Sequence, residues 1–475
     1  MKFVAQLFRR LFSTQYMVKE HMRKGDIPGS REAYKTSLLI AIPAIIEMVS
    51  IALMDMFDAI MVGRGVGPHA LASVNITNQP RMLVFSVFMA LNIALTAIIA
   101  RKKGAGQMDE ARSCLRHGIM IGIVTGTILT ILAISFARPL MVFVRAQDDI
   151  VNYATTYFRI TSSVLVLQVL TSTICVAQRA LGNTKITMRV NVTAKVVSVA
   201  LNFLLIEGRF FFPRMEVEGV AYARAIATCV AFALALASIL RKDSPLRIRL
   251  SDEWRFRKPM LFSIGKLTGN GMLEQVCLRT GFLLYAMVIA ELGTAELAAH
   301  SIAMGLMGLS WTFAEGIGAA TTALVGQNLG RKRPDLSIMY GKVGIRMAVV
   351  CGAILSIFAF TFRYQFVSLF IDAVAYPDIA TAAAVLVLIL ASILPVQTAQ
   401  LVLAGSLRGS GDNRYVALTM LIAVGLMRPV LGFIFVFPLG LGLPGAWISM
   451  IFDQIARLIM LFTRFARGKW TQAKL

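Results

Sequence analysis

The stretch GPHALA (67–72) follows a long apolar run, and it recurs 226 residues later as GTAELA (293–298). Two further blocks recur in the same order: ALTAIIARKKG (94–104) as ATTALVGQNLG (320–330), and RALGNTK (179–185) as RGSGDNR (408–414). Blocks that keep their order and are repeated once indicate an internal duplication. In a membrane protein, such a duplication is typical of transporters whose pathway lies between the two repeats.

The composition indicates a membrane protein. Hydrophobic residues make up 57% of the chain and charged residues only 15%, whereas soluble proteins contain roughly 45–50% apolar residues. Apolar runs long enough to cross a hydrocarbon core of ~30 Å recur throughout the chain. We expect twelve spans, at 38–62, 71–100, 117–137, 152–178, 187–207, 218–240, 260–290, 297–326, 343–362, 378–405, 416–438 and 445–463.

The predicted fold is an all-α integral membrane protein with two six-helix bundles. A transmembrane β-barrel is excluded because no segment shows its apolar/polar alternation. Six spans per repeat is an even number, so both repeats start on the same side and are related by a pseudo-two-fold axis along the membrane normal. The expected parts are an amphipathic N-terminal segment (1–36), an N-terminal lobe (37–240), a linker (241–259), a C-terminal lobe (260–466) and a tail (467–475).

The net charge of +23 is explained by its placement rather than by nucleic-acid binding. If the N-terminus is cytoplasmic, that side collects about 32 Lys and Arg residues and the opposite side only six. The positive-inside rule therefore predicts that both termini are cytoplasmic. We expect the basic excess to contact anionic lipids on the cytoplasmic face and nucleic acid to play no part.

Several other classes of protein find no support in the sequence. No signal peptide precedes the first span; instead Phe3, Leu7 and Leu11 share one helical face, which predicts an interfacial helix or, equally, a disordered tail. The five cysteines and four histidines are scattered without metal-ligand spacing. No P-loop or nucleophile–base pair is present. We expect no enzyme activity and no cofactor beyond a coupling ion, proton or sodium.

The quoted blocks, taken together, resemble the multidrug and toxic compound extrusion (MATE) transporters over nearly the whole chain. The blocks that carry the resemblance are IPAIIEMVSIALMDMFDAIMVGRGVGPHALASVNITNQP (42–80), ELGTAELAAHSIAMGL (291–306), AATTALVGQNLG (319–330) and LAGSLRGSGDN (403–413). The resemblance implies a twelve-helix antiporter of a bacterial-type cytoplasmic membrane. It would export organic, commonly cationic and amphipathic compounds in exchange for protons or sodium, and we expect it to act as a monomer.

The same resemblance implies a cation-coupling site in the N-terminal lobe. Asp58 stands at the position of the family's acidic coupling residue, and a carboxylate at membrane depth needs a reason because it costs about 2.5–3.5 kcal/mol. A solvated acid at a helix end is the alternative interpretation. Asn202 and Thr228 match the family's polar residues in spans five and six. Pro43, fifteen residues before Asp58, is expected to give span one a hinge.

Three more ionisable residues lie close to this site in the predicted helices. Glu47 precedes Asp58 by three helical turns, on nearly the same face and roughly 16 Å deeper. Asp55 is one turn from Asp58 and could share a proton with it. For Glu47 and Asp55, a structural ion pair is as plausible as a transport role. Lys195, two turns before Asn202, would favour protons over sodium if it reaches Asp58; contact with lipid phosphate is the alternative.

In the C-terminal lobe, Glu274 resembles a glutamate of many bacterial members, and Glu315 lies in span eight. Glu315 could serve in coupling or substrate binding, or it could neutralise the charge of Arg279.

The competing function is that of a flippase for lipids or lipid-linked saccharides, because such flippases share a distant version of this fold. A flippase is expected to carry a strongly cationic cavity. That alternative is kept open by five cationic residues at membrane depth: Arg81, Lys195, Lys266, Arg279 and Arg428.

Overall fold

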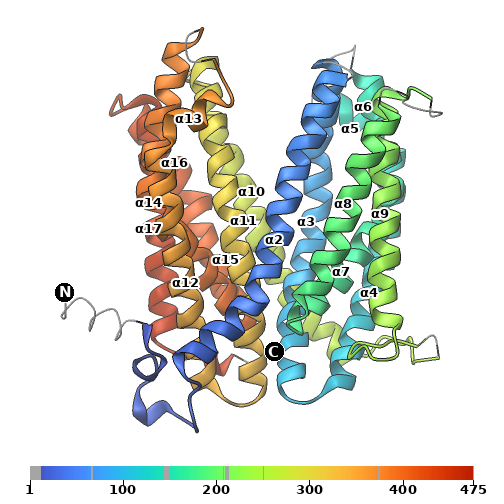
Figure 1. Ribbon diagram of the computed structural model, residues 1–475, viewed down its shortest axis with the longest axis vertical. Coiled ribbons are helices and arrows are strands. Elements are labelled where there is room, and N and C mark those ends of the chain that lie inside the picture. Colours follow the sequence, from blue (N-terminus) through green and yellow to red (C-terminus); the bar gives the residue numbers. More distant parts are fainter. Residues whose placement is uncertain are drawn as a thin grey trace. The chain divides into compact units, whose positions relative to one another are not determined.

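The computed structural model is all-helical and describes residues 12–65, 68–143, 150–206, 208, 213–249, 251–372 and 375–473. Within these ranges no residue is in a β-strand. The apolar face predicted for Phe3, Leu7 and Leu11 lies outside the described residues. The predicted helical membrane fold is confirmed, and its elements are labelled in Figure 1.

Long helices account for nearly all of the described chain. The first half contains α2 (Ser30–Gly65), α3 (Pro68–Gly104), α4 (Met108–Ser135), α5 (Ala137–Phe143), α6 (Val151–Ser163), α7 (Leu165–Ala180), α8 (Thr184–Leu205) and α9 (Glu216–Leu240). The second half contains α10 (Lys258–Ala290), α11 (Thr294–Gly330), α12 (Pro334–Thr361), α13 (Arg363–Ser368), α14 (Pro377–Ser410), α15 (Asn413–Met420), the π-helix η3 (Leu421–Met427), α16 (Arg428–Val436) and α17 (Gly442–Ala466). Short 3₁₀ turns occupy Thr14–Tyr16, Glu20–Met22 and Lys469–Gln472.

Each predicted span coincides with one helix or with a run of consecutive helices. In the described part of the chain, eleven helices are long and apolar enough to cross a membrane, and the pair α6 and α7 makes a twelfth. That pair bends by 49°, whereas the sequence predicted one uninterrupted span at 152–178. Span eleven also contains the unpredicted π-helix η3, which ends just before Pro429. Because proline has no N–H and clashes with the preceding turn, a widened turn is expected there.

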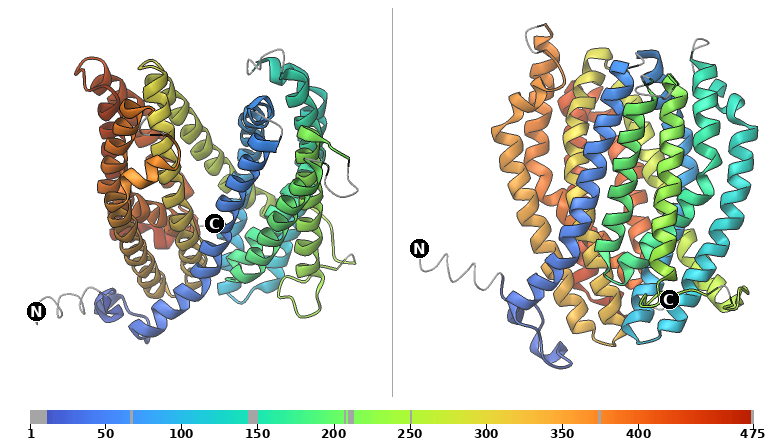
Figure 2. Two further views of the ribbon diagram at one scale, coloured as in Figure 1. Left: turned by 45° about the horizontal axis from the view of Figure 1, so that its top comes forward. Right: turned by 45° about the vertical axis from the view of Figure 1, so that its right-hand side comes forward.

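The chain forms two compact units. We call Ile46–Lys103 with Gln107–Thr268 the N-terminal unit, and Met1–Ile45, Gly104–Gly106 and Gly269–Leu475 the C-terminal unit. Helix α2 therefore begins in the C-terminal unit and continues in the N-terminal one, and the boundary between the two units falls after Ile45, two residues after Pro43. Within each unit the helices run side by side (Figures 1 and 2).

The start of the described chain packs within the C-terminal unit. Met17, Val18 and Ala33 lie in one buried apolar cluster with residues of α11, α12 and α14. The Lys342 ammonium donates to the Met17 carbonyl at 2.7 Å. Packing of this kind stabilises a short N-terminal segment that has little regular structure of its own, because apolar burial contributes about 25 cal/mol per Å².

The internal repeat is visible in the turns that join the helices. After α7, Gly182 has φ +82° and its N–H donates to the Arg179 carbonyl at 2.8 Å. After α14, Gly411 has φ +89° and its N–H donates to the Arg408 carbonyl at 3.0 Å. Glycine adopts this left-handed conformation without the steric cost of a Cβ, so the repeated block ends both helices in the same way.

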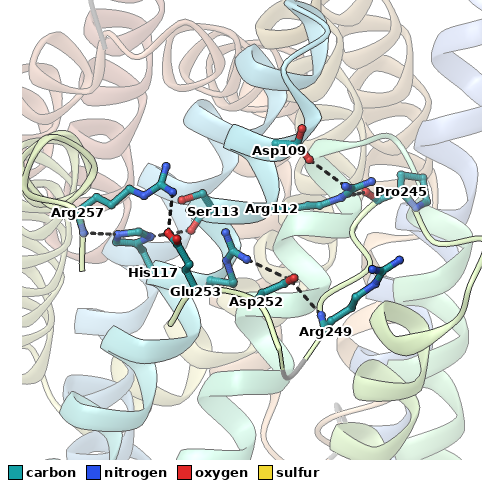
Figure 3. Close-up of polar contacts among 10 residues, drawn as sticks. Asp109, Arg112, Ser113, His117, Pro245, Arg249, Asp252, Glu253 and Arg257 are labelled. Atoms are coloured by element: carbon teal, nitrogen blue, oxygen red, sulfur yellow. Dashed lines mark hydrogen bonds and ion pairs between the residues drawn. The ribbon is translucent and has the colours of Figure 1, made fainter. Parts of the chain in front are cut away.

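The linker between α9 and α10 is anchored on α4 (Figure 3). The N–H of Arg257 donates to His117 Nε2 at 2.9 Å, and His117 Nδ1 lies 2.7 Å from the carbonyl oxygen of Ser113. These two contacts require a neutral imidazole with its proton on Nδ1. The ring is buried. The linker is also tied to α4 by Arg112, which donates to the Pro245 carbonyl at 3.0 Å, and by the ion pair of Arg116 with Asp252.

Candidate functional site

Four of the predicted site residues meet between α2 and α8 in the N-terminal unit. The Asn202 amide donates to Asp58 Oδ1 at 2.8 Å, and Lys195 Nζ lies 3.4 Å from Asp58 Oδ2. The same ammonium donates a short hydrogen bond to Asp55. Lys195 therefore reaches Asp58, which was one of the two alternatives that the sequence left open. We call Asp55, Asp58, Lys195 and Asn202 the acidic cluster.

The cluster is asymmetric in exposure. Asp58 exposes 20% of its side chain and Asp55 exposes 55%, while Asn202 is fully buried. The carboxylate of Asp58 is therefore the better shielded of the two, and its contacts to Lys195 and Asn202 are correspondingly stronger than contacts in bulk water. A proton bound to Asp58 would neutralise the carboxylate, and the electrostatic attraction between Asp58 and Lys195 would then be lost.

The second repeat has no counterpart of this cluster. At the repeat offsets of 226 and 229 residues, Asp55 and Lys195 correspond to Gly281 and Val424. A Cβ built on Gly281 would lie only 2.2 Å from the Val424 carbonyl oxygen. The two helices thus meet at the same place in both repeats, but through an ion pair in one and through close backbone packing in the other.

Thr228 does not contact the cluster in this structure. Its hydroxyl donates to the Arg224 carbonyl of the same helix at 2.9 Å, and its side chain lines a cavity that Lys195 also lines. Of the residues predicted for coupling, the structure therefore brings Asp58 and Asn202 together and places Thr228 on the cavity wall.

Glu47 is held in a separate buried network. Its carboxylate accepts from the Thr187 hydroxyl at 2.7 Å and from the Asn191 amide at 2.6 Å, and Arg179 lies 3.7 Å away. The side chain is 1% exposed. A buried carboxylate with three such partners is well compensated and holds α2 to α7 and α8.

Glu274 occupies the equivalent arrangement in the C-terminal unit. It is fully buried and binds Arg408, whose Nε lies 3.4 Å from Oε2. Arg179 and Arg408 are the first residues of the third repeated block. In each repeat, a buried glutamate on the first span therefore binds the arginine near the end of the fourth. Glu315, by contrast, is an exposed side chain of α11, and Arg279 is exposed on α10.

A second buried charge cluster lies in the C-terminal unit. Asp453 binds Arg457 at 2.7 Å and also binds Arg428 through a short contact. All three side chains are at most 5% exposed. The Arg428 guanidinium lies over the rings of Phe282 and Tyr285, at 4.8 and 5.5 Å. Asp453 therefore lies between two guanidiniums, and the buried charges of this cluster compensate one another.

A cavity of about 400 Å³ lies within the N-terminal unit. Its walls carry four cationic side chains and one carboxylate: Arg81, Arg179, Lys195, Arg224 and Glu47. Apolar side chains complete the lining, among them Met48, Ile51 and Phe85. Lys195 connects this cavity to the acidic cluster, because its ammonium contacts the carboxylates while its side chain lines the cavity.

Comparison with known families decides the membership of the chain. The MatE family model matches residues 43–204 and 272–434, one segment in each repeat. This chain belongs to the MatE family. The predicted resemblance to MATE transporters is therefore confirmed, and the match covers all residues of the acidic cluster.

Curated relatives of this MatE protein match along nearly their whole lengths. A probable multidrug resistance protein NorM of Thermotoga maritima is 26% identical over 459 residues, covering 96% of each chain. Multidrug resistance protein MdtK of Photorhabdus laumondii is 26% identical over 454 residues, covering 92% of this chain and 95% of the relative. Multidrug resistance protein PmpM of Pseudomonas aeruginosa is 24% identical, covering 92% of each.

Solved structures confirm the fold of the MatE chain. A crystal structure of MATE in complex with MaD3S aligns with a TM-score of 0.84 at 21% identity, covering 92% of this chain and 97% of the other. A transporter from Pyrococcus furiosus aligns with a TM-score of 0.84 at 20% identity, covering 93% of this chain and 97% of the other. The Pyrococcus protein is described as having a binding pocket of reverse polarity.

Arg224 is a charged residue of the cavity that the sequence did not single out. Arg224 stands inside the predicted span 218–240 and lines the cavity, where its guanidinium donates to the Tyr157 hydroxyl at 3.1 Å. An arginine within an apolar span was the available signal, since such residues mark functional sites or internal ion pairs. Its neighbours in space could not be inferred, because Tyr157 lies 67 residues earlier in the chain.

Proposed function

We propose that this MatE protein is a secondary active exporter that exchanges small organic compounds for protons. The acidic cluster is the observation that carries the proposal, because it places a shielded carboxylate, a lysine and an amide beside a cavity of ligand size. Relatives named as multidrug resistance proteins support organic compounds as cargo, and a transporter rather than an enzyme.

Coupling follows from the helices that the cluster joins. Asp55 and Asp58 belong to α2 and Lys195 to α8, and both helices also line the cavity. While the carboxylates are charged, the ion pair holds the two walls together. Protonation of Asp58 and Asp55 removes that attraction, so the walls are free to separate and the cavity loses the shape that retains its ligand. Proton and ligand then exclude each other, which is the requirement for exchange.

The lysine favours protons over sodium as the coupling ion. The Lys195 ammonium already occupies the position next to Asp58 where a sodium ion would need to bind. A sodium ion would have to displace a covalently attached cation, whereas a proton binds the carboxylate oxygen itself. Pro43 is the proposed hinge for the resulting movement of α2, because the chain passes between the two units directly after it.

The orientation proposed from the distribution of Lys and Arg has both termini in the cytoplasm.

The energy source is tested by efflux from liposomes that contain the purified protein, with a pH gradient or a sodium gradient imposed separately. Two related dyes would be loaded, the cation rhodamine 6G and the anion sulforhodamine B. We expect a pH gradient alone to drive efflux of at least one dye. Efflux driven only by sodium would contradict the proposed proton coupling.

A flippase for lipids or lipid-linked saccharides is the second candidate function. The observation that favours it is the excess of cationic side chains on the cavity walls, since a lipid phosphate is an anion. The liposome assay separates the two candidates: a flippase would move a fluorescent phospholipid between leaflets and leave both dyes inside. Efflux of a dye under a pH gradient without lipid movement favours the exporter.

We also propose that a linker pocket of about 360 Å³ binds the phosphate of an anionic lipid. It lies where α9 ends and α4 begins, two candidate spans whose ends mark the headgroup layer. Its lining includes five cations and two carboxylates: Arg112, Arg116, Lys242, Arg247, Arg249, Asp109 and Asp252.

Ion pairs inside the pocket neutralise only part of its positive charge. Arg112 pairs with Asp109 at 3.0 Å (Figure 3). Arg116 pairs with Asp252 at 3.1 Å, so two of the arginines are neutralised. The pKa of Asp252 is lowered first by the N–H of the linker backbone and then by Arg116. The other three cationic side chains have no carboxylate within 4.0 Å among the described residues, so they remain available to an anion.

Binding of short-chain phosphatidylglycerol to the purified protein tests this lipid site. The triple variant Lys242→Gln, Arg247→Gln, Arg249→Gln should bind about tenfold more weakly, because three charge-assisted contacts are lost. The control Arg241→Gln, Arg255→Gln, Lys258→Gln removes the same charge from the same linker outside the pocket. Equal weakening of lipid binding in both triple variants would show that the loss comes from general surface electrostatics, and it would refute a defined binding pocket.

A further inference from the structure

The cavity of the N-terminal unit contains two arginines that pair with no carboxylate among the described residues. Arg179 binds Glu47, and Lys195 binds Asp55 and Asp58. For the two others, Arg81 and Arg224, the polar partners in the described structure are neutral. Arg81 donates to the Asn78 amide oxygen at 3.0 Å, and Arg224 donates to the Tyr157 hydroxyl at 3.1 Å.

These two guanidiniums lie on helices that would cross the membrane, α3 and α9. Both line the same cavity, and their charges repel each other. The carboxylates of Asp55 and Asp58 act on these arginines only from beyond 4.0 Å. An arginine without a directly bound carboxylate is costly at membrane depth, and two that repel each other are costlier still. Such an arrangement persists where it serves a ligand, and the ligand that relieves both costs is an anion. Guanidiniums also offer paired N–H donors that match carboxylate, sulfonate and phosphate oxygens.

The remaining walls define the rest of the ligand. Phe85, Met48 and Ile51 provide apolar contacts, and methionine adapts to ligands of different shape. A volume of about 400 Å³ is within the range of cavities that hold drug-sized molecules. Polar side chains such as Gln168 and Ser172 are present as additional hydrogen-bonding groups. The walls therefore suit an amphipathic molecule with one charged end.

We propose that this cavity binds amphipathic organic anions, with the anionic group held between Arg81 and Arg224. The assignment of such anions as exported cargo rests on the proposed exporter function; the binding site itself does not. It departs from the organic cations that the family resemblance had implied, because a cation would face four cationic side chains and a single glutamate already bound to Arg179.

Exchange of an organic anion for a proton requires that the loss of cavity shape on protonation outweigh the freed charge of Lys195, which by itself would attract the anion. The membrane potential favours such an exchange. In a cell whose interior is negative, an anion that leaves and a proton that enters both move in the direction favoured by the membrane potential. Exchange of one monovalent anion for one proton therefore moves two charges in the direction favoured by the membrane potential in each cycle. Exchange of a monovalent cation for a proton moves no net charge and is driven by the pH difference alone.

Equilibrium dye binding to the purified full-length protein in detergent tests the site without any gradient. Sulforhodamine B and rhodamine 6G share a ring system but carry opposite charges. We expect the parent to bind the anion at least tenfold more tightly than the cation. Arg81→Gln and Arg224→Gln should each weaken anion binding by about tenfold, through the loss of a charge-assisted contact. Arg224→Lys, which keeps the charge, should retain part of the affinity.

The control variant is Lys185→Gln with Arg189→Gln. Both residues lie on exposed positions of α8 outside the cavity, so the variant removes two positive charges from the same unit. It should bind both dyes as the parent does. Tighter binding of rhodamine 6G than of sulforhodamine B by the parent, or equal weakening of anion binding in the control, would overturn the proposal.

Competition identifies the source of the anionic group. Displacement of sulforhodamine B by short-chain phosphatidylglycerol, but not by phosphatidylcholine, would support the anion site and assign it to a lipid phosphate. Failure of both lipids to compete would assign it to soluble organic anions. The two proposals fail separately: selective anion binding without pH-driven efflux refutes proton-coupled export alone, and pH-driven efflux of rhodamine 6G without anion binding refutes the anion site alone.

Discussion

Replacement of Asp58 by Asn will reduce pH-driven dye efflux from protein-containing liposomes to the level of protein-free liposomes. The amide keeps the size of the side chain and can still pair with Asn202, but it cannot take up and release a proton. It also leaves Lys195 bound to Asp55 alone. The variant should therefore fold and still bind dye, while it loses the exchange step.

Two neighbouring variants serve as controls for this effect. Asp55→Asn removes a carboxylate that is 55% exposed, and exposed ion pairs contribute about 1 kcal/mol or less, so efflux should fall by no more than about fivefold. Lys195→Gln vacates the position beside Asp58, and we expect a sodium gradient to drive some efflux in that variant. Full pH-driven efflux by Asp58→Asn would remove Asp58 from the mechanism.

Replacement of Asp453 by Asn will cause the largest loss of stability among the charge-removing variants of the C-terminal unit. The substitution leaves Arg428 and Arg457 buried without a compensating negative charge. Breaking a buried ion pair from one side costs about 3–5 kcal/mol. The thermal midpoint of the purified protein should fall by on the order of 10 °C, as measured by intrinsic fluorescence at matched detergent concentration.

The matched control for stability is Asp412→Asn. Asp412 binds Arg464 at 2.7 Å, but that arginine is 27% exposed, so its charge stays partly solvated and the loss should be about 1 kcal/mol. A triple variant with Arg428→Met, Asp453→Leu and Arg457→Met should recover most of the stability, because an apolar replacement leaves no buried charge unpaired. A midpoint of Asp453→Asn equal to that of Asp412→Asn would contradict a structural role for the buried cluster.

Much of the architecture follows from local sequence because membrane spans impose a strong local signal. Length and apolar composition sufficed for the twelve spans, and the duplicated blocks reappear as duplicated turns around Gly182 and Gly411. The proximity of Lys195 to Asp58 was accessible for a similar reason. Asn202 lies two helical turns from Lys195, so a helix that brings Asn202 to Asp58 also brings the lysine.

The features that sequence did not predict depend on partners distant in the chain. The bend between α6 and α7 occurs without a proline at the break, at Val164. The buried partners of Glu47 are 140 and 144 residues away, at Thr187 and Asn191. The net positive charge of the cavity could not be inferred from the sequence, because it depends on which of the cationic side chains have carboxylate partners. Arg179 and Arg224 are equally charged in the sequence, but only Arg179 has a carboxylate partner among the described residues.

The most direct measurement of the central claim is ligand-induced proton release by the purified protein. Sulforhodamine B and rhodamine 6G would be added in turn to detergent-solubilised protein in weakly buffered solution, with a pH-indicator dye that absorbs apart from both. If Asp58 exchanges a proton for the ligand, the parent will release protons on binding its ligand and Asp58→Asn will bind the same ligand without release. Ligand binding by the parent without proton release, or equal release by Asp58→Asn, would contradict exchange through Asp58.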